Sequence, residues 1–282
     1  MTPFNVATDL GRLHVDVVGS GPPVVLWHSM FVDSTSWSRL VPLLPDGRSY
    51  FLVDAPSAGQ SDPIRRVSDI AGCAAAAHLV VETIRERTGS PSVDWVGNAW
   101  GGHVGIRLAA DHADDVRNLV AISSPTHPIS TELRRKIALL LPLFRLVGPR
   151  GPVRAAMDDA VFTEATRASD AGAVRLLHDS LARSGRAMIP AIRTAILNRT
   201  DLTDAAESLS LPVLFVTTDD RGEWTPEEAR AVAARMHDAR EVTVRGARII
   251  PAIEQPGATA SAISGFWQEI ASRGDAAAPV SG

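Results

Sequence analysis

Short apolar runs alternate with longer stretches of helical spacing along residues 1–125 of the chain. Two of the runs, 24–27 and 50–53, are apolar at every position, which is typical of parallel strands buried on both faces, whereas 12–18 alternates. The expected strands are 12–18, 24–27, 50–53, 93–96 and 117–122, and the expected helices are 36–44, 69–88 and a segment that begins at 100. We place an N-cap at Ser68 and a helix stop at Gly89. This rhythm predicts a mostly parallel, doubly wound α/β sheet.

The rhythm changes after residue 125. Between 126 and 208 the apolar positions keep helical spacing, and breakers at Pro142, Gly148, Gly151 and Pro190 divide the segment into pieces. Strands and helices then alternate again, at 213–217, 226–236, 242–245 and 257–272. The pattern predicts a core formed by 1–125 and 209–273, an inserted helical cap at 126–208, and a flexible tail at 274–282.

A sharp strand-to-helix turn is indicated between Gly97 and Gly101. Its frame is that of a nucleophile elbow, G-x-S-x-G, which raises its central residue above the carboxyl edge of the sheet. Here the central position holds Ala99, whose methyl group cannot attack a substrate.

Five segments in the same order resemble landmarks of the α/β-hydrolase superfamily. They are Trp27-His28-Ser29, the stretch from Asp54 to Asp62 (similar to D-x-x-G-x-G-x-S-D, with Ser57 at one glycine), the elbow, the stretch from Pro212 to Ala229, and the stretch from Gly246 to Pro256 (similar to G-x-G-H-x-x-x-x-E-x-P). The resemblance covers nearly the whole chain. It implies an α/β-hydrolase fold with an inserted helical cap.

The resemblance also implies where a Ser-His-Asp triad would stand. The nucleophile position falls on Ala99 and the histidine position on Ile249. The acid position falls on Arg221, although Asp219 or Asp220 restores a carboxylate if the frame shifts. A serine needs a neighbouring base, so with nucleophile and base both absent we expect no serine-type acyl hydrolysis.

The oxyanion hole uses backbone groups, and we expect it to remain. The resemblance implies one N–H from Trp100, directly after the elbow, and one from Ser29 or Met30. His28 ends a strand at the carboxyl edge, where ligands bind in open α/β sheets, and a histidine suits acid or base work near neutrality. The alternative is that His28 only supports its loop, as in catalytic members of the superfamily.

The expected pocket lies between this edge and the cap. Its residues are Trp27, Met30, Asn98, Ala99, Ser123, His127, Arg221, Trp224, Arg248 and Ile249. Tryptophans such as Trp100 and Trp224 favour a flat, apolar ligand. Arg221 and Arg248 offer guanidinium forks for a carboxylate or phenolate, and the alternative is that they pair with Asp219 or Asp220 or are solvated.

Composition narrows the partners. The chain has 282 residues, a formal net charge of −4 and a pI of about 6.1, which does not suit a nucleic-acid partner. No secretory leader pattern and no apolar stretch of bilayer length occurs, so we expect a cytoplasmic protein without a membrane partner. Neither metal-ligand spacing nor a G-x-G-x-x-G turn occurs, so we expect no metal and no cofactor. The sequence leaves a homodimer open.

Three functions compete. The first is a cofactor-independent, non-hydrolytic enzyme acting on an aromatic or polycyclic small molecule by rearrangement, cyclisation, elimination or C–C bond formation. The resemblance permits this chemistry, which superfamily members perform in natural-product biosynthesis. The second is a pseudoenzyme that binds a small molecule as a receptor, carrier or resistance protein. The third is a hydrolase with unorthodox catalytic residues. The sequence does not decide between the first two, but the cap, the intact elbow glycines and the retained His28 favour the first.

Overall fold

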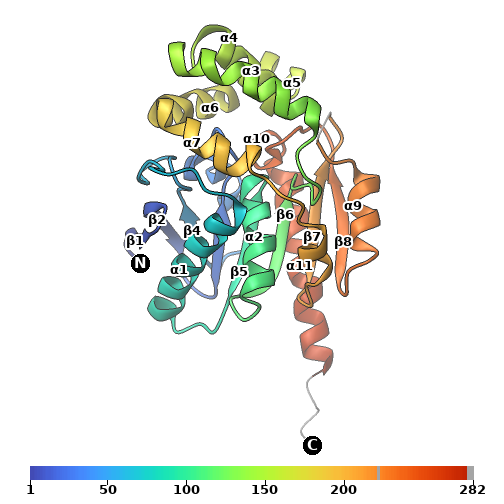
Figure 1. The fold of residues 1–282 in the computed structure, drawn as a ribbon. Helices are drawn as coiled ribbons and strands as arrows, with labels where there is room; N and C mark the ends of the chain where they lie inside the picture. Colours follow the sequence, from blue (N-terminus) through green and yellow to red (C-terminus); the bar gives the residue numbers. More distant parts are fainter. Residues whose placement is uncertain (221–222, 278–282) are drawn as a thin grey trace, which may run out of the picture.

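An eight-stranded sheet forms the centre of the molecule (Figure 1), in the strand order β1-β2-β4-β3-β5-β6-β7-β8. The structure is a computed structural model and describes residues 1–220 and 223–277. The strands are β1 (Phe4–Thr8), β2 (Gly11–Gly19), β3 (Pro23–Trp27), β4 (Ser49–Val53), β5 (Val93–Asn98), β6 (Val116–Ile122), β7 (Val213–Thr218) and β8 (Ala239–Val244). Strands β1, β2 and β4 pair antiparallel, and every pair from β4 to β8 is parallel. The predicted α/β-hydrolase fold class is confirmed.

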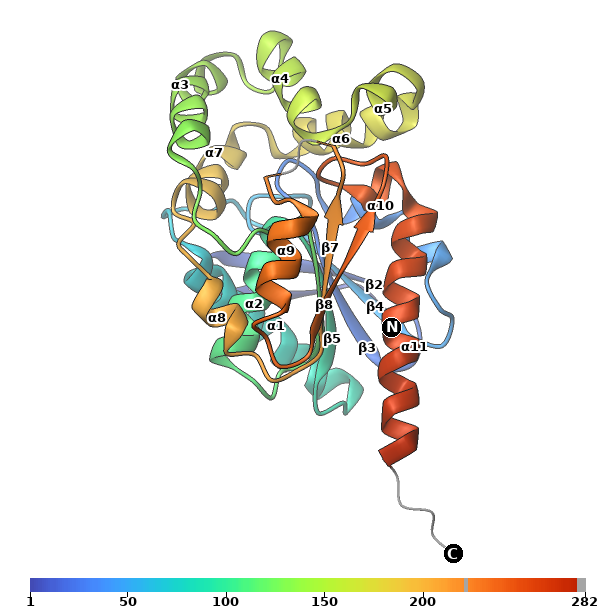
Figure 2. The ribbon, with the colours of Figure 1, turned by 90° about the vertical axis from the view of Figure 1, so that its right-hand side faces the viewer.

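Helices cover both faces of the sheet, as Figure 2 shows. On one face lie α1 (Ile70–Thr88), α2 (Trp100–Asp111), α8 (Thr203–Glu207) and α9 (Pro226–Ala233), and on the other lies α11 (Pro256–Ala277). The short α10 (Pro251–Glu254) precedes α11. Every residue of β3, β4, β5 and β7 is buried, which agrees with their apolar sequences.

A layer of helices lies over the carboxyl ends of the parallel strands (Figures 1 and 2). It consists of α3 (Thr131–Val147), α4 (Gly151–Val161), α5 (Glu164–Ser169), α6 (Ala171–Ser184), α7 (Met188–Ile192) and the turn η4 (Arg193–Leu197). Helix α8, which falls inside the segment expected to be cap, lies instead beside α2 and α9 at the side of the core. The cap therefore covers the edge of the sheet that carries the elbow.

Several local expectations were wrong, each for a physical reason. The helix expected at 36–44 is two 3₁₀ turns, η1 (Ser34–Trp37) and η2 (Val41–Leu43), with Pro42 in the second. The N-cap of α1 is Asp69 and not Ser68, because the Asp69 carboxylate accepts the N–H of Gly72 at 2.9 Å. Pro142 lies inside α3 and does not end it.

The C-terminal helix extends further than predicted. The tail expected to begin at Gly274 is helical through Ala277, and the rest of the expected tail lies outside the described residues. Strand β1, for which the sequence analysis made no specific prediction, pairs with β2 in the register Phe4 to Val15.

Candidate active site

The turn between β5 and α2 has the geometry of a nucleophile elbow. Its apex residue, Ala99, has φ +47° and ψ −102°, which is unusual for a residue other than glycine. Its N–H donates to the carbonyl of Ile122 at 2.7 Å, and its carbonyl accepts the N–H of Gly102 at 3.0 Å. A Cβ at Gly97 would lie 2.2 Å from the Gly101 carbonyl group, and one at Gly101 would lie 2.0 Å from the Trp27 carbonyl oxygen. The glycines therefore allow the close approach that the turn requires.

The elbow presents backbone donors at the floor of a cavity. Trp100 is the first residue of α2, so its N–H has no acceptor within the helix and lies at the positive end of the helix dipole. Ser29 and Met30, from the loop after β3, line the same cavity as Ala99 and Trp100. This arrangement suits stabilisation of an oxyanion.

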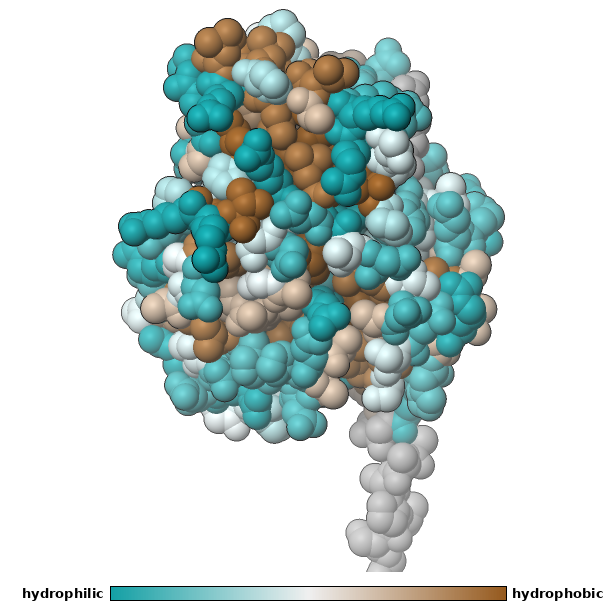
Figure 3. Space-filling view, in the orientation of Figure 1, coloured by the Kyte–Doolittle hydropathy of each residue, from teal (hydrophilic) through white to brown (hydrophobic). Residues whose placement is uncertain are grey.

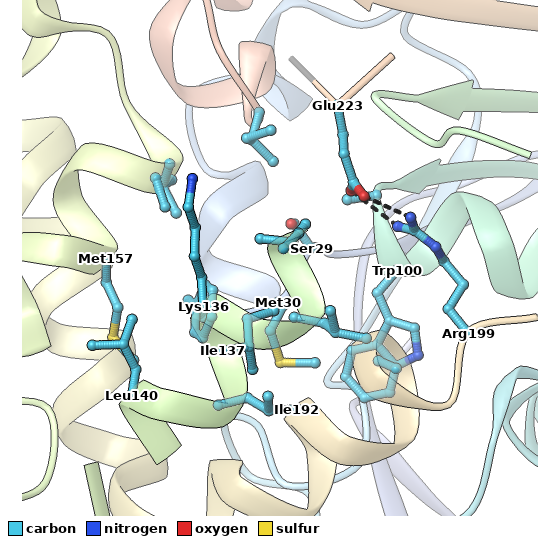
Figure 4. A pocket seen from close by; sticks show the side chains of 18 of the residues that line it. Ser29, Met30, Trp100, Lys136, Ile137, Leu140, Met157, Ile192, Arg199 and Glu223 are labelled. Atoms are coloured by element: carbon cyan, nitrogen blue, oxygen red, sulfur yellow. Dashed lines mark hydrogen bonds and ion pairs between the residues drawn. The ribbon is translucent and has the colours of Figure 1, made fainter. Parts of the chain in front are cut away.

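The cavity itself has a volume of about 710 Å³ and lies between the elbow and the cap (Figure 4). Its upper walls are mostly aliphatic side chains from the cap, namely Ile137, Leu140, Leu141, Phe144, Val153, Met157, Val161, Ile192 and Ile196. A volume of this size accepts a drug-sized molecule. The helical spacing of the apolar positions between 126 and 208 predicts the cap helices but does not show which of their faces meets the core, so none of these side chains was expected in the site.

A buried ion pair forms part of the cavity wall. The guanidinium of Arg199, from the segment after η4, donates to both carboxylate oxygens of Glu223 at 2.6 and 3.0 Å (Figure 4). The side chain of Arg199 is 4% exposed and that of Glu223 is 28% exposed, so the carboxylate is the more accessible partner. No sequence motif marked this pair, since its members come from two loops that only the fold brings together.

Two further polar side chains of the cavity lining each have a buried atom that forms no hydrogen bond with the described residues. His103 donates from Nε2 to the Pro125 carbonyl at 3.0 Å, and its buried Nδ1 has no partner among the described residues. Burial and the charge of Arg199 hold the pKa of His103 well below its ordinary value, so this imidazole is neutral. The buried Oγ of Ser123, at φ +50°, likewise has no partner among those residues.

His28 occupies a different position from the one an acid or base requires. Its Nε2 accepts the N–H of Ala55 at 2.9 Å, which fixes the proton on Nδ1, and Nδ1 lies 2.6 Å from the Ser29 carbonyl. Burial lowers the pKa of His28, and the nearby Asp54 carboxylate opposes that effect. His28 does not line the cavity. This geometry favours the supporting role over the acid–base role.

The positions expected for a base and an acid hold other groups. Ile249 lines the cavity and its N–H donates to Val161 of the cap at 3.3 Å. Asp219 accepts the N–H of Gly246 at 2.8 Å, and Asp220 accepts Nη2 of Arg248 at 2.8 Å. Neither aspartate lines the cavity.

The remaining predicted pocket residues divide between the cavity and its surroundings. Six residues expected in or beside the pocket line it, namely Ser29, Met30, Ala99, Trp100, Ser123 and Ile249. Five others do not, namely Trp27, Asn98, His127, Trp224 and Arg248, and Arg221 lies outside the described residues.

The side chains that do not line the cavity make contacts elsewhere, as three of them show. Trp27 stacks on Trp95 in the core with ring centroids 5.7 Å apart, and Trp224 packs edge-on against Phe215. Asn98 donates to the carbonyl of Ile249 at 2.9 Å, which ties the elbow strand to that loop. These corrections share one cause, because a residue next to a pocket in sequence can point into the core or along the surface.

Three side chains that could bind a metal ion meet outside the cavity lining. His78 of α1, His112 after α2 and Asp115 have ligand atoms within 4.8 Å of one another. The two imidazoles are stacked at 3.7 Å, and Asp115 binds His78 at 2.6 Å and Arg85 at 2.8 Å. Sequence spacing did not indicate this cluster, because its members are brought together by the packing of α1 on α2.

The fold and the site are those of an α/β sheet in which the turn between β5 and α2 lies beneath a helical cap. A family model described as alpha/beta hydrolase fold matches residues 22–183. The chain belongs to this family, which the match over more than half of its length shows.

Relatives and solved structures agree with this membership. A pimeloyl-[acyl-carrier protein] methyl ester esterase of Xanthomonas campestris pv. campestris is 26% identical over 269 residues, 90% of this chain and 98% of the relative. One from Vibrio vulnificus is 30% identical over 112 residues, so that match spans only 40% of either chain. A thermophilic esterase from Thermogutta terrifontis superposes with a TM-score of 0.85 over 96% of this chain and 99% of that one, at 22% identity. This last likeness is one of fold alone.

Proposed function

We propose that the chain is a cofactor-independent, non-hydrolytic enzyme that binds an aromatic or polycyclic small molecule beneath its cap. The reaction class is rearrangement, cyclisation, elimination or C–C bond formation, in the setting of natural-product biosynthesis. The observation that carries the proposal is Ala99, which holds a strained elbow conformation although its methyl group cannot attack. We expect this turn to hold the N–H of Trp100 toward the cavity that Trp100 lines.

We infer that a Ser-His-Asp triad is missing. Ala99 replaces the nucleophile, Ile249 stands at the base position, and Asp219 and Asp220 are engaged by the loop that carries Ile249. Without a nucleophile, the cavity would promote a reaction by polarising the bound substrate and by holding it in a reactive orientation. Two backbone donors stabilise a developing enolate or phenolate as well as they stabilise a tetrahedral oxyanion.

The polar groups of the wall support a role in orienting the substrate. Glu223 is a partly exposed carboxylate of the cavity wall, and Arg199 donates to both of its oxygens. A substrate hydroxyl or a C–H next to a carbonyl is a suitable partner for this carboxylate, while the carbonyl oxygen binds near Trp100. Ser123 and His103 offer a hydroxyl and an imidazole nitrogen for further hydrogen bonds.

A hydrolase with unorthodox residues is the second candidate. The relatives described above are methyl ester esterases, and this likeness favours the hydrolase. In this chain, water would have to be activated by Glu132, Glu223 or His103. These two carboxylates and this imidazole line the cavity, whereas His28, Asp219 and Asp220 do not.

The test is to find ligands among aromatic and polycyclic carbonyl compounds by thermal shift, and then to follow each ligand by mass spectrometry. An isomeric, dehydrated or coupled product supports the proposal. A product that has gained water supports the hydrolase instead, and recovery of unchanged ligand supports the binding protein.

A matched pair of variants on α4 shows whether the ligand occupies this cavity. Ala156 lines it, and the neighbouring Ala155 is exposed and does not. Ala156→Trp should abolish both the shift and the product, and Ala155→Trp should retain both. Equal loss in the two variants, or in neither, would place the ligand elsewhere.

A further inference from the structure

The outer surface of the cap carries an unusual set of exposed leucines. Leu139, Leu140, Leu143 and Leu146 of α3, which we call the leucine face, are 79%, 42%, 37% and 74% exposed. Leu139, Leu143 and Leu146 are spaced by four and three residues, so they form one stripe along the helix. Figure 3 shows hydrophobic side chains gathered at the top of the molecule, over the cap, with hydrophilic ones around them. An apolar gathering rimmed by charge is typical of an interaction site.

The charges around this face are mostly positive. Residues 131–154 contain six basic residues and one acidic residue, although the whole chain has a net charge of −4. The basic residues are Arg134, Arg135, Lys136, Arg145, Arg150 and Arg154, and all six are exposed. A seventh cation, Arg186, donates to the carbonyls of Arg145 and Leu146 at 2.8 Å and so lies at the end of the face. The positive charge is therefore concentrated where the leucines are exposed.

The leucine face is continuous with the mouth of the cavity. Lys136 and Leu140 are exposed on α3, and both also line the cavity. On the other side of the same helix, Ile137, Leu141 and Phe144 form part of the cavity wall. Helix α3 thus separates an apolar interior from an apolar exterior.

We propose that the leucine face docks the cap onto an anionic lipid surface, with the leucines in the headgroup region and the basic side chains on the phosphates. A helix with leucines on one face and arginine or lysine on its flanks binds in the plane of a membrane interface. Helix α3, which carries the face, belongs to the helical layer at the cap end of the molecule (Figure 1). A second copy of this chain would bring the same positive charge to the contact and would be repelled.

The expectation of no membrane partner rests on the absence of a leader pattern and of an apolar stretch of bilayer length, and neither observation tests for a helix lying on a membrane surface. No helix in the described part of the chain is long and apolar enough to cross a membrane. The docking proposal is independent of whether the cavity converts its ligand.

Co-sedimentation with vesicles tests the proposal. The full chain should bind vesicles of phosphatidylcholine and phosphatidylglycerol, bind much less to phosphatidylcholine alone, and be released by salt. Leu139→Ser/Leu146→Ser should remove binding, because these two side chains are the most exposed of the face. The matched control is Val18→Ser/Leu43→Ser, which replaces side chains that are 47% and 51% exposed away from the cap and should leave binding unchanged.

The charge contribution has its own pair of variants. Arg134→Gln/Arg135→Gln should lower the partition coefficient on anionic vesicles roughly tenfold or more. Arg230→Gln/Arg235→Gln makes the same change in net charge on α9 and the turn that follows it, and should lower the partition coefficient much less. Circular dichroism of all four variants shows that each is folded.

Three results would overturn the proposal. They are failure of the wild type to bind anionic vesicles, equal binding by the leucine variant and the wild type, and a dimer in sedimentation velocity that Leu139→Ser/Leu146→Ser dissociates. The last would assign the face to a second copy. An acidic protein that bound this face while vesicles did not would also exclude the lipid surface.

Discussion

Ala99 has the backbone conformation of a nucleophile elbow, but its side chain is a methyl group that cannot act as a nucleophile. A residue other than glycine at φ +47° stores strain of about 1–3 kcal/mol, and the surrounding hydrogen bonds hold it there. Ser124 contributes by donating to the Ala99 carbonyl at 3.1 Å. The site therefore keeps a preorganised donor while presenting only a methyl group to the ligand.

We expect Ala99→Ser to leave ester hydrolysis at the wild-type level. The new hydroxyl would have no base, since Ile249 stands at the base position and Asp220 is bound to Arg248. Turnover of a p-nitrophenyl ester measures this. Ala99→Ser/Ile249→His supplies an imidazole and should exceed Ala99→Ser by roughly a hundredfold. Substantial turnover by Ala99→Ser alone would reveal a base that the geometry does not show.

The Arg199–Glu223 pair should behave as a buried unit. Glu223→Gln leaves the guanidinium without its counter-charge at a side chain that is only 4% exposed, so we expect a loss of about 3 kcal/mol in the free energy of unfolding. Removing both charges in Arg199→Met/Glu223→Gln should cost less than the sum of the two single changes. Urea unfolding of the four proteins measures the coupling, and strictly additive losses would contradict it.

At the scale of elements, the elbow depends on glycines that let a strand and a helix approach closely. We expect Gly101→Ala to lower the free energy of unfolding by about 3 kcal/mol or more, because its Cβ would lie 2.0 Å from the Trp27 carbonyl oxygen. Thermal unfolding measures the loss. Gly265→Ala on α11 is the control, since its Cβ meets nothing within 4 Å, and it should stabilise the helix by roughly 0.5–1 kcal/mol. A mild effect of Gly101→Ala would mean that the elbow can relax.

The sequence predicts the core elements well because burial leaves a simple pattern there. The continuous apolar runs of β3, β4 and β7 each became a strand buried at every residue. Gly89 ends α1 at φ +69°, as its position after the last helical turn indicated. Pro142 was expected to break the helix but lies inside α3. The other interactions of α3 therefore outweigh the cost of a proline in a helix interior.

The site was only partly predictable for a related reason. Motif positions identified the floor of the cavity at Ser29, Ala99 and Trp100, where the backbone fixes the geometry. They gave no access to Arg199 and Glu223, which come from separate loops. His28 was expected to end a central strand and directly follows β3, but the sequence does not show that both of its nitrogens meet backbone groups.

At the scale of the whole molecule, the cap and core are joined by polar contacts as well as by the cavity walls. Arg39 of the core binds Asp170 of the cap at 2.5 and 2.9 Å, and Arg183 of the cap binds Asp33 at 2.7 Å. The hydrogen bonds from Arg39 hold the pKa of Asp170 far below its ordinary value, so this contact persists into acid solution. A loss of stability in mildly acidic solution must therefore come from other groups.

We expect that loss to come from buried histidines. Burial lowers the folded-state pKa of both His28 and His103, so as the pH falls the unfolded chain takes up a proton near the ordinary pKa of 6.5 before the folded chain does. Their stabilising contribution is complete above that pH and is lost as the pH falls toward the folded values, by about 1.4 kcal/mol per pH unit for each group. Urea unfolding between neutral and mildly acidic pH should show this slope, and His103→Gln should reduce it. A free energy of unfolding that stays constant over the range would show that these imidazoles accept protons in the folded state, and would reopen acid–base roles for both.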